Sequence, residues 1–236
     1  MEPLKVSRSP RILGIETSTL HCEIALAEGE FPVASTTLPA GLKPTASLVP
    51  AIRDLCRSAG LNPRELELIC VDQGPGSYTG LRVGVTCAKT LAFAAGSALA
   101  TAGSLEVVAQ NAPAGENLVE VAFDAARGQV FTCRFRRLSN TWVAEHEVRI
   151  ESASDWARTL APNSLVIGPA LSKYRELVPD HHRVADESLW WPRADWVVRI
   201  GHRQHLVAPR VEYFSLEPVY LRPSAAEEKR GIGTGA

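Results

Sequence analysis

The sequence predicts an α/β protein built from two similar lobes. Apolar strand patterns alternate with helix patterns along most of the 236 residues, and a glycine-rich loop joins one strand pattern to a helix pattern. The order of strand, acidic residue, small-residue turn and second strand also occurs twice, which indicates two structurally similar units. The repeated segments are 12–16 with 22–27 and 118–124 with 129–135.

Apolar spacing predicts the other elements of the first half. Leu48, Ile52 and Leu55 recur as neighbours on one helix face do, and Gly60 then ends that pattern. The most apolar stretch, at 83–102, contains a lysine and threonines, so a buried helix explains it better than a membrane span. We expect a strand at 31–38, a helix at 46–59, a strand at 66–71 and a helix at 80–95.

The second half contains weaker patterns of the same kinds. They predict a third strand at 142–150, a short strand at 164–167, and helices at 154–160, 170–178 and 194–206. We therefore expect a first lobe at 1–110, a smaller second lobe at 111–223, and a disordered tail at 224–236. The segment 179–204, which is rich in tryptophan and histidine, has no predicted role.

Overall composition restricts the classes of function. The chain is 45% hydrophobic and 22% charged, as globular proteins are. A net charge of −1 argues against a large basic surface that would wrap nucleic acid without help. The five cysteines form no CxxC pair, which argues against a zinc ribbon or a thioredoxin-type site and favours a reducing compartment. With no apolar leader visible, we expect a cytoplasmic protein without membrane contact.

The strongest single motif is the loop at 74–80, which reads Gly-Pro-Gly-Ser-Tyr-Thr-Gly. A helix that starts after such a loop offers free N–H groups and a positive dipole end to a phosphate or carboxylate. The loop lacks the Lys-Ser/Thr ending of a P-loop. The alternative is a tight strand-to-helix turn in which Ser77 or Thr79 caps the helix, and spacing alone favours this turn.

Small residues recur every four positions along the helix after this loop, at Gly80, Gly84, Ala88, Ala92 and Gly96. Positions four apart lie on one face of a helix. Such a stripe lets another backbone approach closely, and that backbone could belong to the protein's own sheet or to a partner chain. The sequence alone does not separate these two interpretations.

Acidic residues end the first strand of each half, at Glu16 and Asp124. In two-lobed phosphotransferases, acids at such positions hold Mg²⁺ or water near a phosphate. The hydroxyl groups of Thr17 and Ser18 could bind the same phosphate. The alternative is that both acids belong to ordinary surface turns.

Several segments resemble the TsaB (YeaZ) family. They are ILGIETS at 12–18, GPGSYTGLRVG at 74–84, AKTLA at 88–92, FDAARGQVF at 123–131 and PVYLRP at 218–223. The similarity covers most of 11–223, and its most specific part is the block at 74–89. The resemblance implies an actin/sugar-kinase-like fold of two ribonuclease-H-like lobes. It also implies a role in making threonylcarbamoyladenosine on tRNA, beside the anticodon.

The resemblance further implies a subunit without chemistry, cofactor or metal of its own. Such a subunit binds and activates a TsaD-like catalytic protein, is joined by a TsaE-like ATPase, contacts tRNA through the complex, and can form a homodimer when alone. Family members pair with TsaD through helices of the first lobe, so the implied interface residues are Leu48, Ile52, Leu55, Gly80, Arg82, Gly84, Ala88 and Ala92. The implied remnants of a phosphate site are Glu16, Thr17, Ser18, Gly74, Gly76, Ser77 and Asp124.

Two rival functions follow from the same fold. A small ATP-dependent kinase or ATPase would need Mg²⁺-dependent nucleotide binding through Glu16 or Asp124, and the family usually has Asp where this chain has Glu16. A glycoprotease-like metallopeptidase would need the His-x-x-x-His pair that the catalytic relative carries on the helix matching 46–59. The segment 45–51 contains no histidine. The pair His202 and His205 shares a helix face but has no further ligand nearby.

Overall fold

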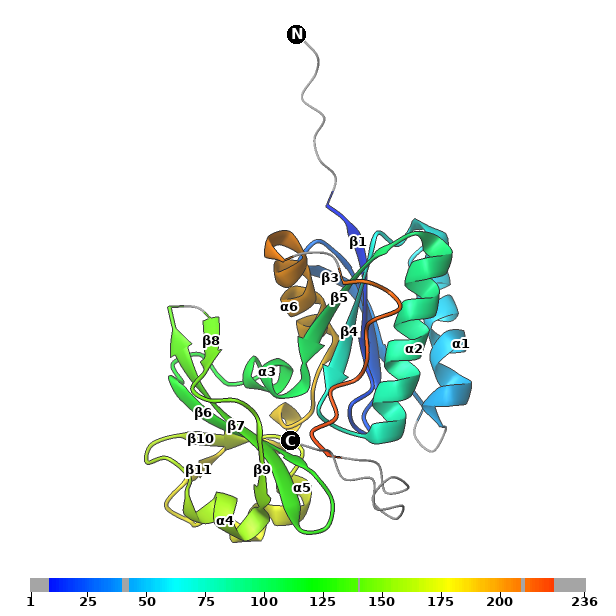
Figure 1. The fold of residues 1–236 in the computed structure, drawn as a ribbon. Helices are drawn as coiled ribbons and strands as arrows, with labels where there is room; N and C mark the ends of the chain where they lie inside the picture. Colours follow the sequence, from blue (N-terminus) through cyan, green and yellow to red (C-terminus); the bar gives the residue numbers. More distant parts are fainter. Residues whose placement is uncertain (1–8, 40–42, 140, 209–210, 223–236) are drawn as a thin grey trace.

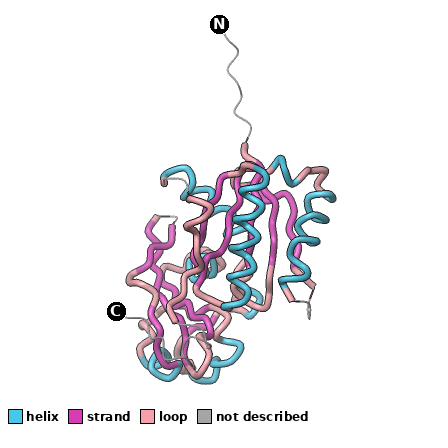
Figure 2. The backbone as a smooth tube through the Cα atoms, turned by 45° about the vertical axis from the view of Figure 1, so that its right-hand side comes forward, coloured by secondary structure: helices cyan, strands magenta, loops and turns pink. Residues whose placement is uncertain are grey.

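Two β-sheets divide the protein into two lobes (Figure 1). The structure is a computed structural model that describes residues 9–39, 43–139, 141–208 and 211–222. The expected tail at 224–236 lies outside the described residues. Figure 2 shows the same division from a second direction, with helices packed along the sheet of the larger lobe.

The first lobe is a five-stranded sheet with the strand order β3-β2-β1-β4-β5. Strand β1 runs antiparallel to β2 and parallel to β4, and β4 runs parallel to β5. The elements are β1 (Arg11–Glu16), β2 (Glu23–Glu28), β3 (Phe31–Thr37), α1 (Pro44–Ser58), η1 (Pro63–Glu65), β4 (Leu68–Gly74), α2 (Tyr78–Ala95), β5 (Ala98–Gly103) and α3 (Ser104–Ala109).

The second lobe repeats this order around a six-stranded sheet, β11-β10-β6-β7-β8, in which β9 also pairs with β7. Strand β6 runs antiparallel to β7 and parallel to β10, as β1 does to β2 and β4. Its elements are β6 (Leu118–Asp124), β7 (Gln129–Leu138), β8 (Thr141–Ala144), β9 (Arg149–Ser152), α4 (Ala153–Arg158), β10 (Leu165–Ile167), α5 (Leu171–Tyr174), η2 (Arg175–Leu177), β11 (Arg183–Val184) and η3 (Glu187–Leu189). The chain then continues into α6 (Ala194–Val207), which packs on the first sheet. The predicted repeat is thus confirmed.

Side chains of the first sheet alternate between two helical layers. Leu13 and Ile15 pack with α1 and α2, whereas Ile12 packs with α6 on the other face. Gly14 also faces α6, where an added Cβ atom would come within 2.6 Å of the carbonyl oxygen of Ala194. Because both faces are covered, the central strands form continuous apolar runs.

The helix expected at 80–95 is confirmed as α2, which Gly96 ends in the left-handed conformation. The rest of the apolar stretch 83–102 forms β5. Two other expectations are wrong. The region 142–150 forms two strands, β8 and β9, which pair with different parts of β7. The second lobe ends after η3 and not at residue 223, because α6 packs on the first sheet.

The segment 211–222, here called the C-terminal strap, returns along α2 to the junction of the lobes (Figure 1). The Nζ of Lys89 donates to the carbonyl oxygen of Leu216 at 2.9 Å, and the side chain of Leu216 is buried in the α1–α2 core. The amide of Val219 donates to the carbonyl oxygen of Gln73 at 2.7 Å. The strap therefore holds the first lobe along the whole length of α2.

The small-residue stripe of α2 faces this chain's own interior. Ala88 and Ala92 are fully buried in the core formed by α1, α2 and the sheet. At Gly84, an added Cβ atom would lie 2.2 Å from the hydroxyl oxygen of Thr17. The close approach that the stripe permits is therefore used inside the first lobe.

We predict that Ala88→Trp lowers the free energy of unfolding by about 3 kcal/mol or more, because the site has no space for an indole ring. The matched control is Ala94→Trp, which changes an exposed position of the same helix and should leave stability within about 1 kcal/mol. Urea unfolding followed by circular dichroism measures both. Equal stability of the two variants would show that the stripe is not core.

Candidate functional site

The turn after β1 and the loop before α2 are in direct contact at the place where a phosphate site was expected. The amide of Ser77 donates to the carbonyl oxygen of Ser18 at 2.7 Å, and the hydroxyl of Thr17 donates to the carbonyl oxygen of Gly80 at 2.8 Å. Added Cβ atoms at Gly76 and Gly80 would lie 2.5 and 2.0 Å from carbonyl oxygens of the opposite loop. Glycine is thus required here for close backbone approach.

This contact leaves no room for a phosphate between the loops. The side chains of Glu16, Thr17 and Ser18 are all buried. The hydroxyl of Ser77 accepts a hydrogen bond from the amide of Gly80 at 3.3 Å and so caps α2, which the sequence analysis favoured. The loop at 74–80 is therefore a strand-to-helix turn whose helix end is occupied by the chain itself.

Glu16 does not reach solvent but pairs with Asp72 at the end of β4. One oxygen of Glu16 accepts from the amide and the hydroxyl of Ser18, both at 2.6 Å. One oxygen of Asp72 accepts from the amide of Gly74 at 2.7 Å and from the hydroxyl of Ser104 at 2.6 Å. The two remaining oxygens, Oε2 of Glu16 and Oδ2 of Asp72, are buried and accept no hydrogen bond from an N–H or O–H group of the described residues.

One shared proton satisfies both of these remaining oxygens. Burial raises the pKa of Glu16 well above its usual range, and the charge and hydrogen bond of Asp72 raise it further. Protonated Glu16 then donates to the carboxylate of Asp72. Such a neutral-plus-anionic pair joins the ends of β1 and β4 in the interior of the first lobe.

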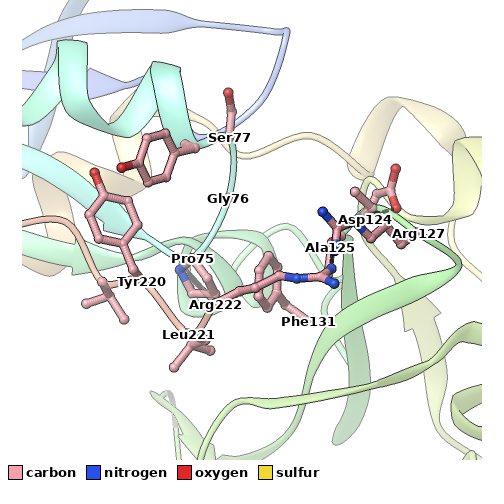
Figure 3. Close-up of a pocket in the computed structure, with 13 residues that line it drawn as sticks. Pro75, Gly76, Ser77, Asp124, Ala125, Arg127, Phe131, Tyr220, Leu221 and Arg222 are labelled. Carbon is pink, nitrogen blue, oxygen red and sulfur yellow. Dashed lines mark hydrogen bonds between the residues drawn. The ribbon is translucent and has the colours of Figure 1, made fainter. Parts of the chain in front are cut away.

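A cavity of about 360 Å³ lies where the two lobes meet. It is lined by the 74–80 loop, the turn after β6 and the end of the C-terminal strap, including Gly76, Ser77, Asp124, Arg127, Phe131, Tyr220 and Arg222. In Figure 3, the side chain of Arg222 extends across the cavity toward Ala125, to whose carbonyl oxygen it donates at 3.1 Å. The strap therefore contacts both lobes at this site.

The turn after β6 holds Asp124 at the edge of this cavity. Ala126 and Arg127 adopt positive φ angles of 60° and 53°, and the carboxylate of Asp124 accepts from the amide of Ala126 at 2.9 Å. The hydroxyl of Tyr174 donates to the same carboxylate at 3.1 Å. Asp124 is therefore already engaged by the second lobe, as the turn interpretation expected.

The predicted phosphate residues thus fall into two groups. Gly76, Ser77 and Asp124 line the interlobe cavity together. The residues Glu16, Thr17, Ser18 and Gly74 are buried beneath it and do not line it. Sequence reasoning missed the contribution of Tyr220 and Arg222, although both lie in the PVYLRP segment. That segment could have indicated a site contact, but nothing in the sequence shows which surface it covers.

The predicted interface residues are mainly internal. Leu48, Ile52 and Leu55 belong to the α1–α2 core, and Gly80, Gly84, Ala88 and Ala92 face the sheet. Arg82 alone among them is exposed, with its guanidinium 4.1 Å above the ring of Tyr78 and its Nε donating to the hydroxyl of Tyr220 at 2.9 Å. A partner surface on these helices must therefore use their outward side chains.

Two further findings concern metals and membranes. Within the described ranges, no group of three or more His, Cys, Asp or Glu side chains could hold a metal ion. No helix among the described residues is long and apolar enough to cross a membrane.

We predict that Glu16→Gln stabilises the protein above pH 5, since the amide keeps the Ser18 contacts and donates to Asp72 without needing a proton. In the wild type, the unfolded chain releases the Glu16 proton near the ordinary value of 4.5 while the folded chain retains it. Wild-type stability therefore falls as pH rises above 4.5, by at most about 1.4 kcal/mol per pH unit from this group.

Urea unfolding between pH 4.5 and 8 measures this slope. The exposed carboxyl variant Glu28→Gln is the control and should preserve the wild-type slope. A Glu16→Gln variant with the wild-type slope would contradict the shared-proton pair.

Comparison with known proteins shows which family this chain belongs to. The family model described as TsaD, tRNA N6-adenosine threonylcarbamoyltransferase, matches residues 43–176, which is more than half of the chain. The TsaB protein of Bacillus subtilis is 29% identical over 92% of this chain and 96% of its own length. The TsaB protein of Escherichia coli is 26% identical over 93% and 97%.

Solved structures show the same fold. YeaZ from Pseudomonas aeruginosa superimposes with a TM-score of 0.78 at 24% identity, covering 90% of this chain and 100% of that one. Component A of (R)-2-hydroxyglutaryl-CoA dehydratase from Acidaminococcus fermentans gives 0.50 at 8% identity, covering 84% and 100%. The two lobes thus form the predicted actin/sugar-kinase-like fold. The chain belongs to the TsaD-like threonylcarbamoyltransferase family and, within it, to the TsaB (YeaZ) family involved in tRNA threonylcarbamoyladenosine biosynthesis.

Proposed function

We propose that this chain binds and activates a TsaD-like enzyme through the outward side of α2, and contributes no chemistry of its own. The observation that carries the proposal is an exposed aromatic patch on that helix. In the same proposal, a TsaE-like ATPase joins the pair, the chain can form a homodimer when alone, and tRNA is contacted through the complex. The net charge of −1 supports leaving most tRNA contact to the partners.

The aromatic patch consists of Phe93 from α2 and Tyr213 and Phe214 from the C-terminal strap. Phe93 is 64% exposed and Phe214 is 80% exposed. The ring of Phe93 lies 5.9 Å from that of Phe214 and 6.3 Å from that of Tyr213. Together with Lys89 and neighbouring threonines, the patch surrounds a hollow of about 270 Å³.

Such a patch suits a protein partner. Large aromatic side chains are enriched at the centres of interfaces, where a few of them supply most of the binding free energy. The side of α1 that faces outward adds Val49, which is 58% exposed, next to α2. Because the stripe residues are internal, a partner of α2 must use its exposed side chains, and Phe93 is the large hydrophobic one among them.

The rival function, an ATP-dependent kinase or ATPase, is favoured by the interlobe cavity of about 360 Å³, which Ser77 and Asp124 help to line (Figure 3). Two observations count against it. The loops that would surround phosphates are bonded to each other, and Glu16 is buried against Asp72. The activating role therefore agrees better with the geometry.

We predict that Phe93→Asp weakens binding of the TsaD-like protein from the same organism by at least about tenfold, because it places a carboxylate at the centre of the patch. The matched control is Phe31→Asp, which changes a phenylalanine that is 77% exposed on the edge strand β3 and should bind as the wild type does. Surface plasmon resonance with the immobilised TsaD-like protein measures both.

The same variants are then added to a reconstituted tRNA modification reaction. We expect Phe93→Asp to lose the modified nucleoside in proportion to lost binding, and Phe31→Asp to retain it. Wild-type binding by Phe93→Asp would refute the patch. Full modification in a reaction that lacks this chain would refute the activating role itself.

A further inference from the structure

The second lobe contains a polar hollow that the proposed function does not use. It measures about 190 Å³ and is lined by side chains from β6, β7, β9 and α4. A single water molecule needs only about 10–15 Å³ of such space. Its lining includes Glu120, Thr132, Arg134, Arg149, Glu151 and Trp156. None of these residues lines the interlobe cavity.

Strand register places these polar side chains on one face of the sheet. Glu120 lies opposite Arg134, and Thr132 lies opposite Arg149. Glu151 follows Arg149 by two positions and so shares its face. The other face of the same strands is the apolar core of the lobe. Packing of α4 against the sheet calls for apolar residues here as well, so the polar set requires a different explanation.

Trp156 supplies an unused hydrogen-bond donor at this hollow. Its side chain is 2% exposed and packs in the core of the lobe, and its Nε1 has no hydrogen-bond partner among the described residues. A buried N–H group without an acceptor costs free energy, and buried polar groups in proteins are nearly always bonded. Trp156 also lines the hollow, so an acceptor bound there would satisfy this donor.

Charges of both signs line the hollow, and they are engaged to different degrees. Arg134 donates to Glu120 at 2.6 Å, and Glu120 also accepts from the amide of Ala161 at 3.1 Å. The side chains of Arg149 and Glu151 form no hydrogen bond or salt bridge with another described residue. Arg149 is exposed and Glu151 is half-buried, and the charge of Arg149 acts to lower the pKa of Glu151, which burial raises. Because neither side chain is held by a hydrogen bond, both are available to a ligand.

We propose that this hollow binds a small zwitterion of the free α-amino acid class. Its carboxylate accepts from the guanidinium of Arg149 and from the Nε1–H of Trp156, and its ammonium group donates to the carboxylate of Glu151. Arginine suits this carboxylate because its planar donors match the two oxygens. A simple anion would leave Glu151 unpaired, and a simple cation would leave Arg149 and the indole unpaired.

The test uses the full chain labelled with ¹⁵N at the tryptophan indole nitrogens. The Trp156 signal is assigned as the one that disappears in Trp156→Phe, which keeps an aromatic ring in the core. The labelled protein is titrated with glycine, and separately with acetate and methylammonium, which carry the two halves of its charge. We expect the Trp156 signal to move saturably with glycine, with a dissociation constant of about 1 mM.

Arg149→Met should weaken this glycine response at least about tenfold. The matched control Arg158→Met removes an exposed arginine of α4 that does not line the hollow, and should respond as the wild type does. Unchanged signals from the other four tryptophans show that each variant is folded.

Three results would overturn the proposal. No movement of the Trp156 signal at about 20 mM glycine would show that the hollow holds water only. An equal response to acetate would make it a plain anion site. A wild-type response from Arg149→Met would remove the assigned carboxylate partner.

Discussion

The contact between the turn after β1 and the loop before α2 is the constraint on which the first lobe depends. Two hydrogen bonds, from Ser77 to Ser18 and from Thr17 to Gly80, join the loops, and glycines at 76 and 80 allow the backbones to meet. This contact fixes where α2 begins and brings its small-residue face onto the sheet. It also forms one wall of the interlobe cavity. A larger residue at either glycine would separate the helix from the sheet.

The same contact changes what the two-lobed fold can do. In a nucleotide-binding arrangement, loops at the ends of strands surround phosphates with free N–H groups. In this chain, the amide of Ser77 is bonded to Ser18, the amide of Gly80 is bonded to Ser77, and Glu16 shares a proton with Asp72. These two amide donors are therefore bonded within the protein itself. This leaves the outward side of α2 and the C-terminal strap as the surfaces proposed to bind a partner.

Much of the fold could be predicted because its signals are local. Apolar periodicity located β1, β2, β4, α1 and α2, and the strand–acid–turn–strand repeat indicated two lobes. The strand β5 was missed because its alanines and threonine carry little strand propensity and follow directly on an apolar helix. The return of α6 to the first sheet was missed because the apolar pattern of an amphipathic helix does not indicate which sheet the helix packs on.

The site was harder to predict for the same reason. Periodicity identified the face of α2 that carries Gly80, Gly84 and Ala88, but could not show whether sheet or partner would meet it. Glu16 and Asp124 hold equivalent places in the two lobes, yet one is sealed beside Asp72 and the other faces a cavity. Only three-dimensional packing distinguishes them, because burial depends on residues distant in the chain.

The most direct measurement of the central claim is a calorimetric titration of the isolated chain with ATP and Mg²⁺. Because the turn after β1 and the loop before α2 are in direct contact, no space remains for phosphates between them. We therefore expect no saturable heat at ligand concentrations up to about 1 mM. Tight binding that is lost in Asp124→Ala would contradict the account, since it would show that the loops open to admit phosphates. The chain would then have to be treated as a nucleotide-binding protein in its own right.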